Sequence, residues 1–295
     1  SLDSAVYFDR VFSFYDNEFS QTLEPRVFYS YTDYEDQSML PMFDTALIDL
    51  NQNSIFSENQ FIGGDRVMDS HQITLGATSR VINNEGLEKL HVTLAQRFYL
   101  DDRKVLSEAQ FNNSDYQGDS SDVFMSIGSS LTRALRVNSE LQYNLDEDKT
   151  NDVTLDTKYN PEPGKLFNGS YRFVRDPNSS NDIEQINIYG QWPIAPGWSS
   201  VGRYQYDLED HGAIESLAGL SYDAGCWTSS IVFQSFALPN DDKMNNTIFF
   251  MLELGNLGAI ESGGDGALEE ALYRNVPGSY MASDLPDNYR QNYLK

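Results

Sequence analysis

The sequence predicts an all-β fold, specifically an antiparallel transmembrane β-barrel of the outer-membrane type, of which this chain supplies a fragment of about thirteen strands. Three observations favour this fold. Long segments alternate apolar and polar side chains, the connections between them sort into short and long ones, and a mean hydropathy of -0.50 coexists with 18 Tyr and 17 Phe. In a membrane barrel only every second strand residue must face lipid, so a polar average is compatible with a continuous apolar surface.

The alternation is clearest over 136–146, where Val137, Leu141 and Tyr143 share one face and charged or amide side chains take the other. The same period of two predicts strands along most of the chain. They cover 4–15, 19–32, 71–81, 88–100, 122–133, 136–146, 151–160, 165–175, 183–193, 198–208, 213–223, 226–237 and 245–255. These lengths suit tilted membrane strands of about 9–11 residues better than the strands of a soluble sandwich.

The connections between the predicted strands alternate in length. Short links, such as 16–18 and 133–135, follow every odd-numbered strand, and the other set contains the long connections 33–69 and 101–121. Outer-membrane barrels have short periplasmic turns and longer extracellular loops. We therefore assign 1–258 to the C-terminal part of a barrel and 259–295, which is rich in Gly, Pro and polar residues, to a periplasmic tail.

An odd number of strands in one sheet leaves unpaired edges, and each unsatisfied backbone group in lipid costs several kcal/mol. We therefore expect further strands from outside this chain. The opening Ser1-Leu2-Asp3-Ser4 is not a signal peptide, so we expect a longer precursor. Whether the fragment closes or folds alone stays open.

Two stretches are more specific than the strand pattern. The first contains Thr22-Leu23-Glu24-Pro25-Arg26 and Asp36-Gln37-Ser38, and the second contains Gly64-Asp65-Arg66. Together they resemble the signature of the LptD family, the lipopolysaccharide-assembly proteins of the bacterial outer membrane. The segment Gly225-Cys226-Trp227 resembles the part of that family that carries paired cysteines, of which only one is present here.

The resemblance implies a translocon that inserts lipopolysaccharide into the outer leaflet through a laterally gated barrel of about 26 strands. It also implies an LptE-like lipoprotein plug in the lumen and a periplasmic lipopolysaccharide bridge that reaches the barrel through an N-terminal domain missing here. In that arrangement 245–255 is one lip of the gate, although an ordinary closing strand is an equal alternative. The candidate gate residues are Thr247, Ile248, Phe249, Phe250, Met251, Leu252 and Glu253. Of these, the alternation places Ile248, Phe250 and Leu252 towards lipid and the others inward.

Cys226 is the single cysteine, so it cannot form a disulfide within the chain. Strand parity places it at the periplasmic rim. The resemblance implies a disulfide to the missing domain, and a buried, inert thiol is the alternative. Within the signature, Pro25 interrupts a predicted strand, which indicates a bulge. Glu24 and Arg26 share the inward face, where a structural role is favoured over contact with a substrate.

Other functions are also compatible with parts of the sequence. A passive porin would need an inward-folded loop with opposed rows of charges, whereas 33–69 carries the family stretch. A soluble carbohydrate-binding sandwich would need the aromatic face to be a core. Asp210-His211 is the one acid–histidine neighbour pair, and without a third group it does not indicate an enzyme. His71 and His91 lack metal-ligand spacing. No cofactor is predicted, and the net charge of -25 argues against nucleic acid as a partner.

Overall fold

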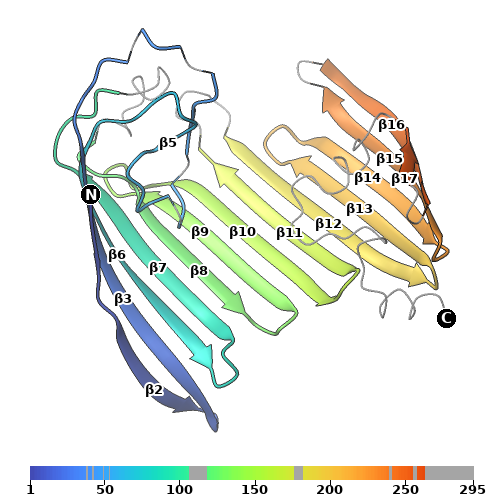
Figure 1. Ribbon diagram of the computed structural model, residues 1–295, viewed down its shortest axis with the longest axis horizontal. Helices are drawn as coiled ribbons and strands as arrows, with labels where there is room; N and C mark the ends of the chain where they lie inside the picture. The colour runs from blue at the N-terminus through green and yellow to red at the C-terminus, as the bar shows by residue number, and fades with distance from the viewer. Residues whose placement is uncertain are drawn as a thin grey trace. The chain divides into compact units, whose positions relative to one another are not determined.

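The computed structural model consists of strands joined by tight turns and longer connections (Figure 1). It describes residues 1–37, 39–41, 43–48, 50–52, 54–105, 118–175, 182–238, 241–254 and 258–262. Two parts of the sequence predictions, Ser38 and the tail from 263 onward, lie outside the described residues. Among the residues described, no helix is long and apolar enough to cross a membrane.

Seventeen strands are present in the described part of the chain. They are β1 (Leu2–Ala5), β2 (Phe8–Phe14), β3 (Asn17–Thr32), β4 (Ala46–Leu47), β5 (Phe61–Ile62), β6 (Ser70–Asn83), β7 (Glu88–Tyr99), β8 (Val123–Ser130), β9 (Leu135–Asn144), β10 (Lys149–Glu162), β11 (Lys165–Val174), β12 (Ile183–Ala195), β13 (Trp198–Asp207), β14 (Gly212–Asp223), β15 (Trp227–Leu238), β16 (Asp241–Leu254) and β17 (Gly258–Glu261).

Fifteen of these strands form one sheet in the order β1-β3-β6-β7-β8-β9-β10-β11-β12-β13-β14-β15-β16-β17, with β2 also paired to β3. The remaining two, β4 and β5, pair with each other. Every neighbour in the large sheet follows the previous one along the chain, which is the topology of an up-and-down antiparallel sheet. The predicted all-β antiparallel fold is confirmed. Among the described strands the order has two ends, so the sheet is open.

Each of the thirteen predicted strands corresponds to a strand of this sheet. The predicted strand 4–15 is divided into β1 and β2. Three short strands, β4, β5 and β17, were not predicted, and β17 extends the sheet into residues that we had expected to belong to the tail. The connections sort by length as predicted, because long ones follow β3 and β7 whereas tight turns such as Pro163–Gly164 and Pro196–Gly197 join hairpins.

The predicted bulge at Pro25 is wrong. Pro25 pairs with Ala77 of β6 in a ladder that runs from Phe19 to Thr32 without a register shift. On its other side the carbonyl of Pro25 accepts a hydrogen bond from the amide of Val6, at 3.1 Å. In an antiparallel ladder the N–H of a residue points to the same neighbour as its C=O, so the donor that Pro25 lacks would face Val6. The proline therefore interrupts the neighbouring strand, which becomes β1 and β2.

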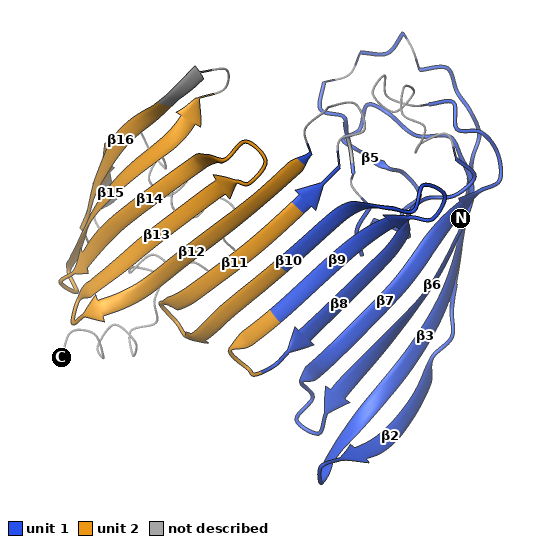
Figure 2. Ribbon diagram, turned by 180° about the vertical axis from the view of Figure 1, so that it is seen from behind, with its two compact units in different colours: residues 1–131, 137–155, 173–182 blue, residues 132–136, 156–172, 183–295 orange. Residues whose placement is uncertain are grey.

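The chain divides into two compact units, 1–131 with 137–155 and 173–182, and 132–136 with 156–172 and 183–295 (Figure 2). In the first unit, strands β3, β6, β7 and β8 expose one apolar face. Its exposed large side chains are Leu23, Val27, Leu75, Leu94 and Phe98. The opposite face of the same strands is polar and largely buried. Its buried members include Ser30, Gln72, Thr74, Thr93, Arg97 and Ser126.

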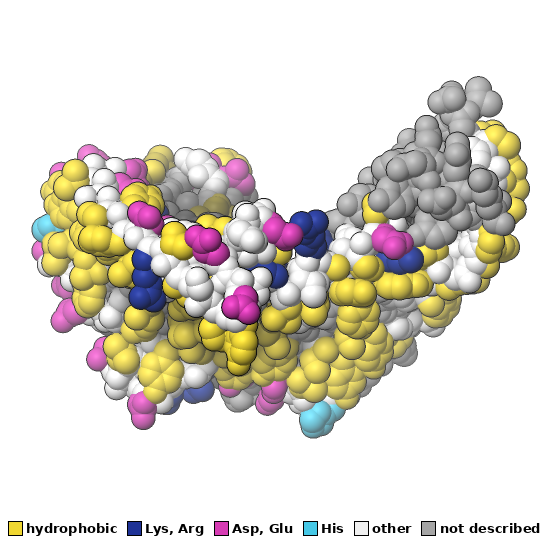
Figure 3. Space-filling model, turned by 90° about the horizontal axis from the view of Figure 1, so that it is seen from below, with side chains coloured by type: hydrophobic (Ala, Val, Ile, Leu, Met, Phe, Trp, Pro, Cys, Tyr) yellow, Lys and Arg dark blue, Asp and Glu magenta, His cyan; other side chains and the backbone are white. Residues whose placement is uncertain are grey.

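The second unit has the same two-faced character. On β15, Trp227, Ile231 and Phe233 are exposed, whereas Thr228 and Ser230 on the other face are buried, as the alternation predicts. A small apolar cluster of Leu217, Val232 and Met251 lies among the buried residues. Figure 3 shows hydrophobic side chains gathered in patches on the side that is seen, with Asp, Glu, Lys and Arg side chains scattered among and around them. Apolar side chains on this scale remain exposed in water only at a cost of roughly 25 cal/mol per Å².

Candidate functional site

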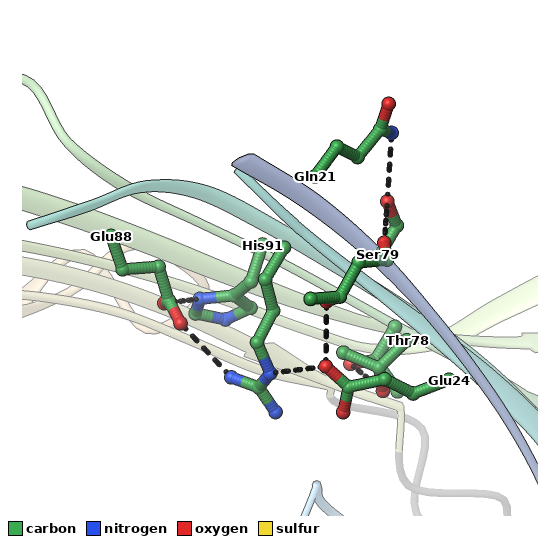
Figure 4. Close-up of polar contacts among 9 residues, drawn as sticks. Gln21, Glu24, Thr78, Ser79, Glu88 and His91 are labelled. Carbon is green, nitrogen blue, oxygen red and sulfur yellow. Dashed lines mark hydrogen bonds and ion pairs between the residues drawn. The ribbon is translucent and has the colours of Figure 1, made fainter. Parts of the chain in front are cut away.

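The polar face of the first unit carries a chain of hydrogen bonds across β3, β6 and β7 (Figure 4). The hydroxyl of Thr22 donates to Glu24, and Glu24 Oε1 lies 3.3 Å from Nε of Arg80. Arg80 also donates to Glu88 at 3.0 Å, and Glu88 in turn pairs with Nδ1 of His91 at 2.8 Å. These groups satisfy one another within the strands, as partly buried charges require.

Arg26, the second charged residue of the signature, has partners of its own. Its Nε and Nη2 donate to the two carboxylate oxygens of Asp3 on β1 at 2.9 and 2.6 Å, a bidentate pair. Its guanidinium also lies over the ring of Phe56, 4.2 Å from the centroid. Glu24 and Arg26 share one face, as predicted, and each is held by a different residue. Both line a pocket of about 630 Å³ together with Asp3, Tyr7, Gln52, Phe56, Gly76, Thr78, Arg80 and Thr93.

A turn of the 33–69 connection lies directly on this polar face. We call residues 50–52 and 54–57 the covering turn. The amide of Ile55 donates to the carbonyl of Asn51, and the amide of Ser57 donates to the carbonyl of Ser54, both at 3.0 Å. Ile55 is fully buried against Ala95 of β7 and Phe124 of β8. The covering turn therefore packs on the sheet through an apolar residue although the surrounding face is polar.

Arg97 of β7 lies beneath the covering turn and is fully buried. Its Nη2 donates to the carbonyl oxygens of Ser54, Ile55 and Ser57 at 3.1, 2.6 and 3.4 Å. Its Nε donates to the hydroxyl of Thr74 at 3.4 Å, and that hydroxyl donates to the carbonyl of Ile55 at 3.3 Å. Polar groups of two strands thus converge on the backbone of one turn.

Gly76 provides the space for the next residue of the covering turn. A Cβ atom at this position would lie 2.7 Å from the tip of the Phe56 ring and 3.0 Å from Cβ of Ala95. Only a residue without a side chain lets Phe56 reach the strand and, beyond it, Arg26. The Gly at this point of β6 thus links the covering turn to the signature residues of β3.

The remaining signature residues build the 33–69 connection itself. The side-chain amide of Gln37 donates to the carbonyl of Val67 and accepts from its amide, at 2.7 and 3.0 Å. Asp65 accepts the amides of Phe43 and Asp44 at 2.8 and 3.0 Å. These amides, that of Asp44 first, hold the pKa of Asp65 below its ordinary value. The two signature stretches, which are far apart in sequence, therefore contact each other.

The second stretch is preceded by a glycine that the backbone conformation requires. Gly63 has a φ of +89°, and a Cβ there would lie 2.7 Å from the carbonyl oxygen of Asp44, whereas a Cβ at Gly64 would meet no atom within 4 Å. The glycine that the conformation requires is thus Gly63, next to the family-motif residue Gly64. Arg66 donates to the carbonyl of Gln37 at 3.4 Å. Asp36, the other described member of the first stretch, lies in the same irregular segment.

The second unit contains a polar ladder of its own. Arg203 of β13 lies 3.1 Å from Glu215 of β14, and both side chains are nearly buried. Arg203 also donates to Asn187 of β12, and Gln234 of β15 donates to Glu215 at 2.6 Å. Four adjacent strands are thus joined across the polar face by side chains, in addition to their backbone ladder.

The other residues named in the sequence analysis, Cys226 and the residues of β16, do not lie together in one site. Cys226 is an exposed free thiol in the turn before β15. In β16, Ile248 and Phe250 are exposed and Met251 is buried, which agrees with the predicted faces. β17 pairs with β16 over Met251–Leu254, so the described residues leave the edge of β16 without a strand partner only before Phe250.

The histidines likewise show structural roles. Asp210 and His211 belong to the turn between β13 and β14, in which Asp207 accepts the amides of Glu209 and Asp210. His71 contacts Asp101 at 2.5 Å. Within the described residues no group of three His, Cys, Asp or Glu side chains could hold a metal ion. The geometry of these described residues provides a polar wall with a covering turn.

A family model described as "LptD: LPS transport system D" matches residues 1–198, two thirds of the chain. The chain belongs to the LptD family. Three curated relatives carry the name LPS-assembly protein LptD. The one from Thiobacillus denitrificans is 38% identical over 97% of this chain and 38% of its own length. Those from Azoarcus sp. and Chromobacterium violaceum are 35% and 37% identical, over 98% and 94% of this chain and 35% of their own length in each case. This LptD-family chain thus spans a little over a third of the relatives that it matches.

Sequence reasoning identified the LptD family, which the family model confirms, but it missed Arg97, Thr74 and Gly76 as a group. The alternation already put Arg97 and Thr74 on the polar face, which was the available signal. It could not show that part of the 33–69 connection folds back over them, because that contact joins residues about 20 to 40 positions apart and depends on backbone carbonyls, which every residue has.

Proposed function

We propose that this chain forms part of the wall of an outer-membrane barrel that delivers lipopolysaccharide to the outer leaflet of that membrane. One observation carries the proposal: in a chain of the LptD family, the strands of each unit expose apolar side chains on one face and polar ones on the other, and in the first unit a turn folds onto the polar face. The apolar face suits contact with hydrocarbon, and the polar face suits a hydrated lumen. The names of the relatives, LPS-assembly protein, support the cargo.

The test uses the full-length parent protein in its own bacterium, under conditional depletion. Surface lipopolysaccharide, detected with an antibody on intact cells, should fall on depletion. A full-length copy should restore it, and a copy that lacks these 295 residues should not. If uptake of small solutes falls while surface lipopolysaccharide is unchanged, the proposal is wrong.

A passive porin is the second candidate, because a segment does fold onto the polar face. The covering turn presents backbone carbonyls and the apolar Ile55 to the sheet, however, and the charges of Arg26 and Arg80 are paired with carboxylates. A porin would need opposed rows of unpaired charges, and these contacts pair the charges instead. Ion conductance of the purified parent in a planar bilayer separates the two, since a porin conducts steadily without cargo.

The partners follow from the same proposal. The polar face would meet an LptE-like lipoprotein plug, and a periplasmic lipopolysaccharide bridge would dock on a domain outside this chain. Photocrosslinkers in the second unit, at Gln205 on the polar face and Tyr204 on the apolar one, test the plug. Crosslinks to a lipoprotein should form from the first position only.

For the lateral gate, β16 supplies the proposed lip, with Thr247, Phe249, Met251 and Glu253 inward and Ile248, Phe250 and Leu252 towards lipid. The edge of β16 before Phe250 is the part available for opening, because β17 pairs with the rest. Paired cysteines at Leu252 and Ile260, which are direct partners in the register, should crosslink in the full-length protein. Neither single cysteine should do so.

Cys226 is exposed in a turn, which supports the proposal that it forms a disulfide with a segment outside this chain. On a nonreducing gel the full-length parent should show a reducible mobility shift that Cys226→Ser lacks. Identical migration of the two proteins would contradict the disulfide and leave an accessible thiol without a structural role.

A further inference from the structure

Arg97 is a cation in an unusual position. It is fully buried on the polar face, and among the described residues no carboxylate lies within ion-pair distance of it. A buried charge without an opposite charge is stable only if dipoles replace its hydration. Here those dipoles are the carbonyls of the covering turn, with the hydroxyls of Thr74 and Tyr99 beside them.

The carbonyls of Ser54, Ile55 and Ser57 belong to one turn, which backbone hydrogen bonds from Ile55 to Asn51 and from Ser57 to Ser54 hold together. They converge on one nitrogen of Arg97, and the side-chain amide of Gln72 reaches the same Ser57 carbonyl at 3.5 Å. Arg97 donates from Nη2 to these carbonyls and from Nε to Thr74 at the same time, and a lysine has no second nitrogen that could do so. The arrangement thus depends on arginine.

The contact is also incomplete. Nη1 of Arg97 is buried and has no hydrogen-bond partner among the described residues. If the covering turn moved away, water could hydrate both Nη1 and Nη2. The free energy of this hydration would offset much of the free energy lost with the hydrogen bonds to the turn. A latch of this kind holds a segment in place without making its release prohibitive.

We propose that Arg97 is a positioning residue that holds the covering turn on the polar face and thereby sets how far that face is open to passage. The second half of this statement rests on the proposed function, because it takes the polar face to line the lumen. The pinning of the turn by Arg97 does not.

The experiment measures exposure of the covering turn in the full-length parent, in cells, with Ser54→Cys as the only cysteine. Ser54 is buried, and the exchange is nearly isosteric. A membrane-impermeant maleimide added to intact cells should label it slowly when Arg97 is present. Arg97→Gln should raise the initial rate about tenfold or more, and Arg97→Lys should give an intermediate rate. Arg203→Gln, the loss of an arginine that pairs with Glu215 instead, should leave the rate unchanged.

A second reporter, Ser230→Cys on β15, distinguishes local release from general loosening, since it is buried far from the turn in sequence. Its labelling should not respond to Arg97→Gln. Equal labelling of Ser54→Cys with and without Arg97, or a parallel rise at Ser230→Cys, would overturn the proposal. If Arg97→Gln gives no folded band on an unheated gel, the same labelling experiment is carried out with Thr74→Val instead. It removes the hydroxyl between Arg97 and Ile55, and a rate that does not rise overturns the proposal.

Labelling reports on the turn without reference to any cargo. If surface lipopolysaccharide did not fall on depletion of the parent protein, the proposed function would be refuted, and the role of Arg97 would remain. Failure of the labelling result alone would refute the role of Arg97 and leave the function.

Discussion

At the scale of single residues, the size of a side chain decides whether the covering turn can lie on the sheet. Gly76 is where the turn comes closest to β6, and the ring of Phe56 fills the volume that a side chain would need. Gly169 of β11 offers a contrast, because no atom lies within 4 Å of a Cβ placed there. The two glycines therefore differ in what a larger residue would do.

We predict that Gly76→Leu displaces the covering turn and destabilises the folded protein by about 1–3 kcal/mol, the usual range for overpacking. Gly169→Leu, the same exchange in open space, should change stability by less than about 0.5 kcal/mol. Limited proteolysis within 50–57 and denaturant unfolding measure the two effects. Equal proteolysis of both variants would contradict the close approach at Gly76.

Asp65 gives a prediction for pH. Its pKa in the folded protein is held below the ordinary value of 3.8 by the amides of Asp44 and Phe43. A carboxylate with a lowered pKa stabilises the folded state above its unfolded pKa, and that contribution disappears as the pH falls through the folded value. The protection factors of the Phe43 and Asp44 amides, which correct for the pH dependence of intrinsic exchange, should therefore stay constant from neutral pH down to about pH 4 and fall below it. Asp65→Asn should exchange faster at neutral pH and lose the pH dependence.

At the scale of strands, the alternation of apolar and polar side chains was enough to predict a strand wherever the two faces of that strand differ in polarity. All thirteen predicted segments form strands, because a shift by one residue would turn each apolar set towards the polar face. The residues at which strands end or divide were harder to predict from the sequence. Pro25 was read as a bulge from its residue type alone, and the register on both sides shows an uninterrupted β3.

The reason lies in which neighbour the missing donor faces. Pro193 of β12 does lie at a register shift, between Pro193 and Ala195, as the general rule expects. Pro25 avoids one because its nitrogen faces β1 and β2, where the ladder can stop without displacing β6. That direction depends on the pairing phase, which a single sequence does not contain. The covering turn and β17 were missed for a similar reason, since they depend on contacts between distant segments.

We predict that Pro25→Ala restores the ladder at Val6 and joins β1 and β2 into one strand. The new amide at position 25 would donate to the carbonyl of Val6, which contributes roughly 0.5–1.5 kcal/mol locally. Hydrogen exchange in 2–14 should become about threefold to tenfold slower. Pro193→Ala serves as the control, because its register shift should persist and exchange in 2–14 should not change.

At the scale of the whole molecule, the two faces of the sheet make opposite demands on a substitution. Phe233 is exposed on the apolar face of β15, and the next residue, Gln234, is on the polar face and donates to Glu215. If the apolar face meets lipid, a charge at Phe233 must be buried in hydrocarbon or carried to the interface.

We predict that Phe233→Lys lowers the stability of the folded full-length protein in membranes by about 2–4 kcal/mol if the site lies near the bilayer midplane. Gln234→Lys should cost less, because its ammonium faces polar neighbours and lies beside Glu215. The amount of folded, heat-modifiable protein in isolated membranes measures both. A larger loss for Gln234→Lys would reverse the assignment of the two faces.

The pairing of charges on the polar face also has an electrical consequence. Arg26, Arg80 and Arg203 each have a carboxylate within 3.3 Å, so these three charges are largely neutralised where they lie, whereas Arg97 is a buried cation without such a partner among the described residues. The chain nevertheless has a formal charge of -25, and acidic residues are concentrated in connections such as 33–36 and 101–102. Mobile cations should therefore gather at the ends of the strands and not along them. Changes in ionic strength, which act within about 10 Å at 0.1 M salt, would then alter the approaches to the wall and leave the wall itself unaffected.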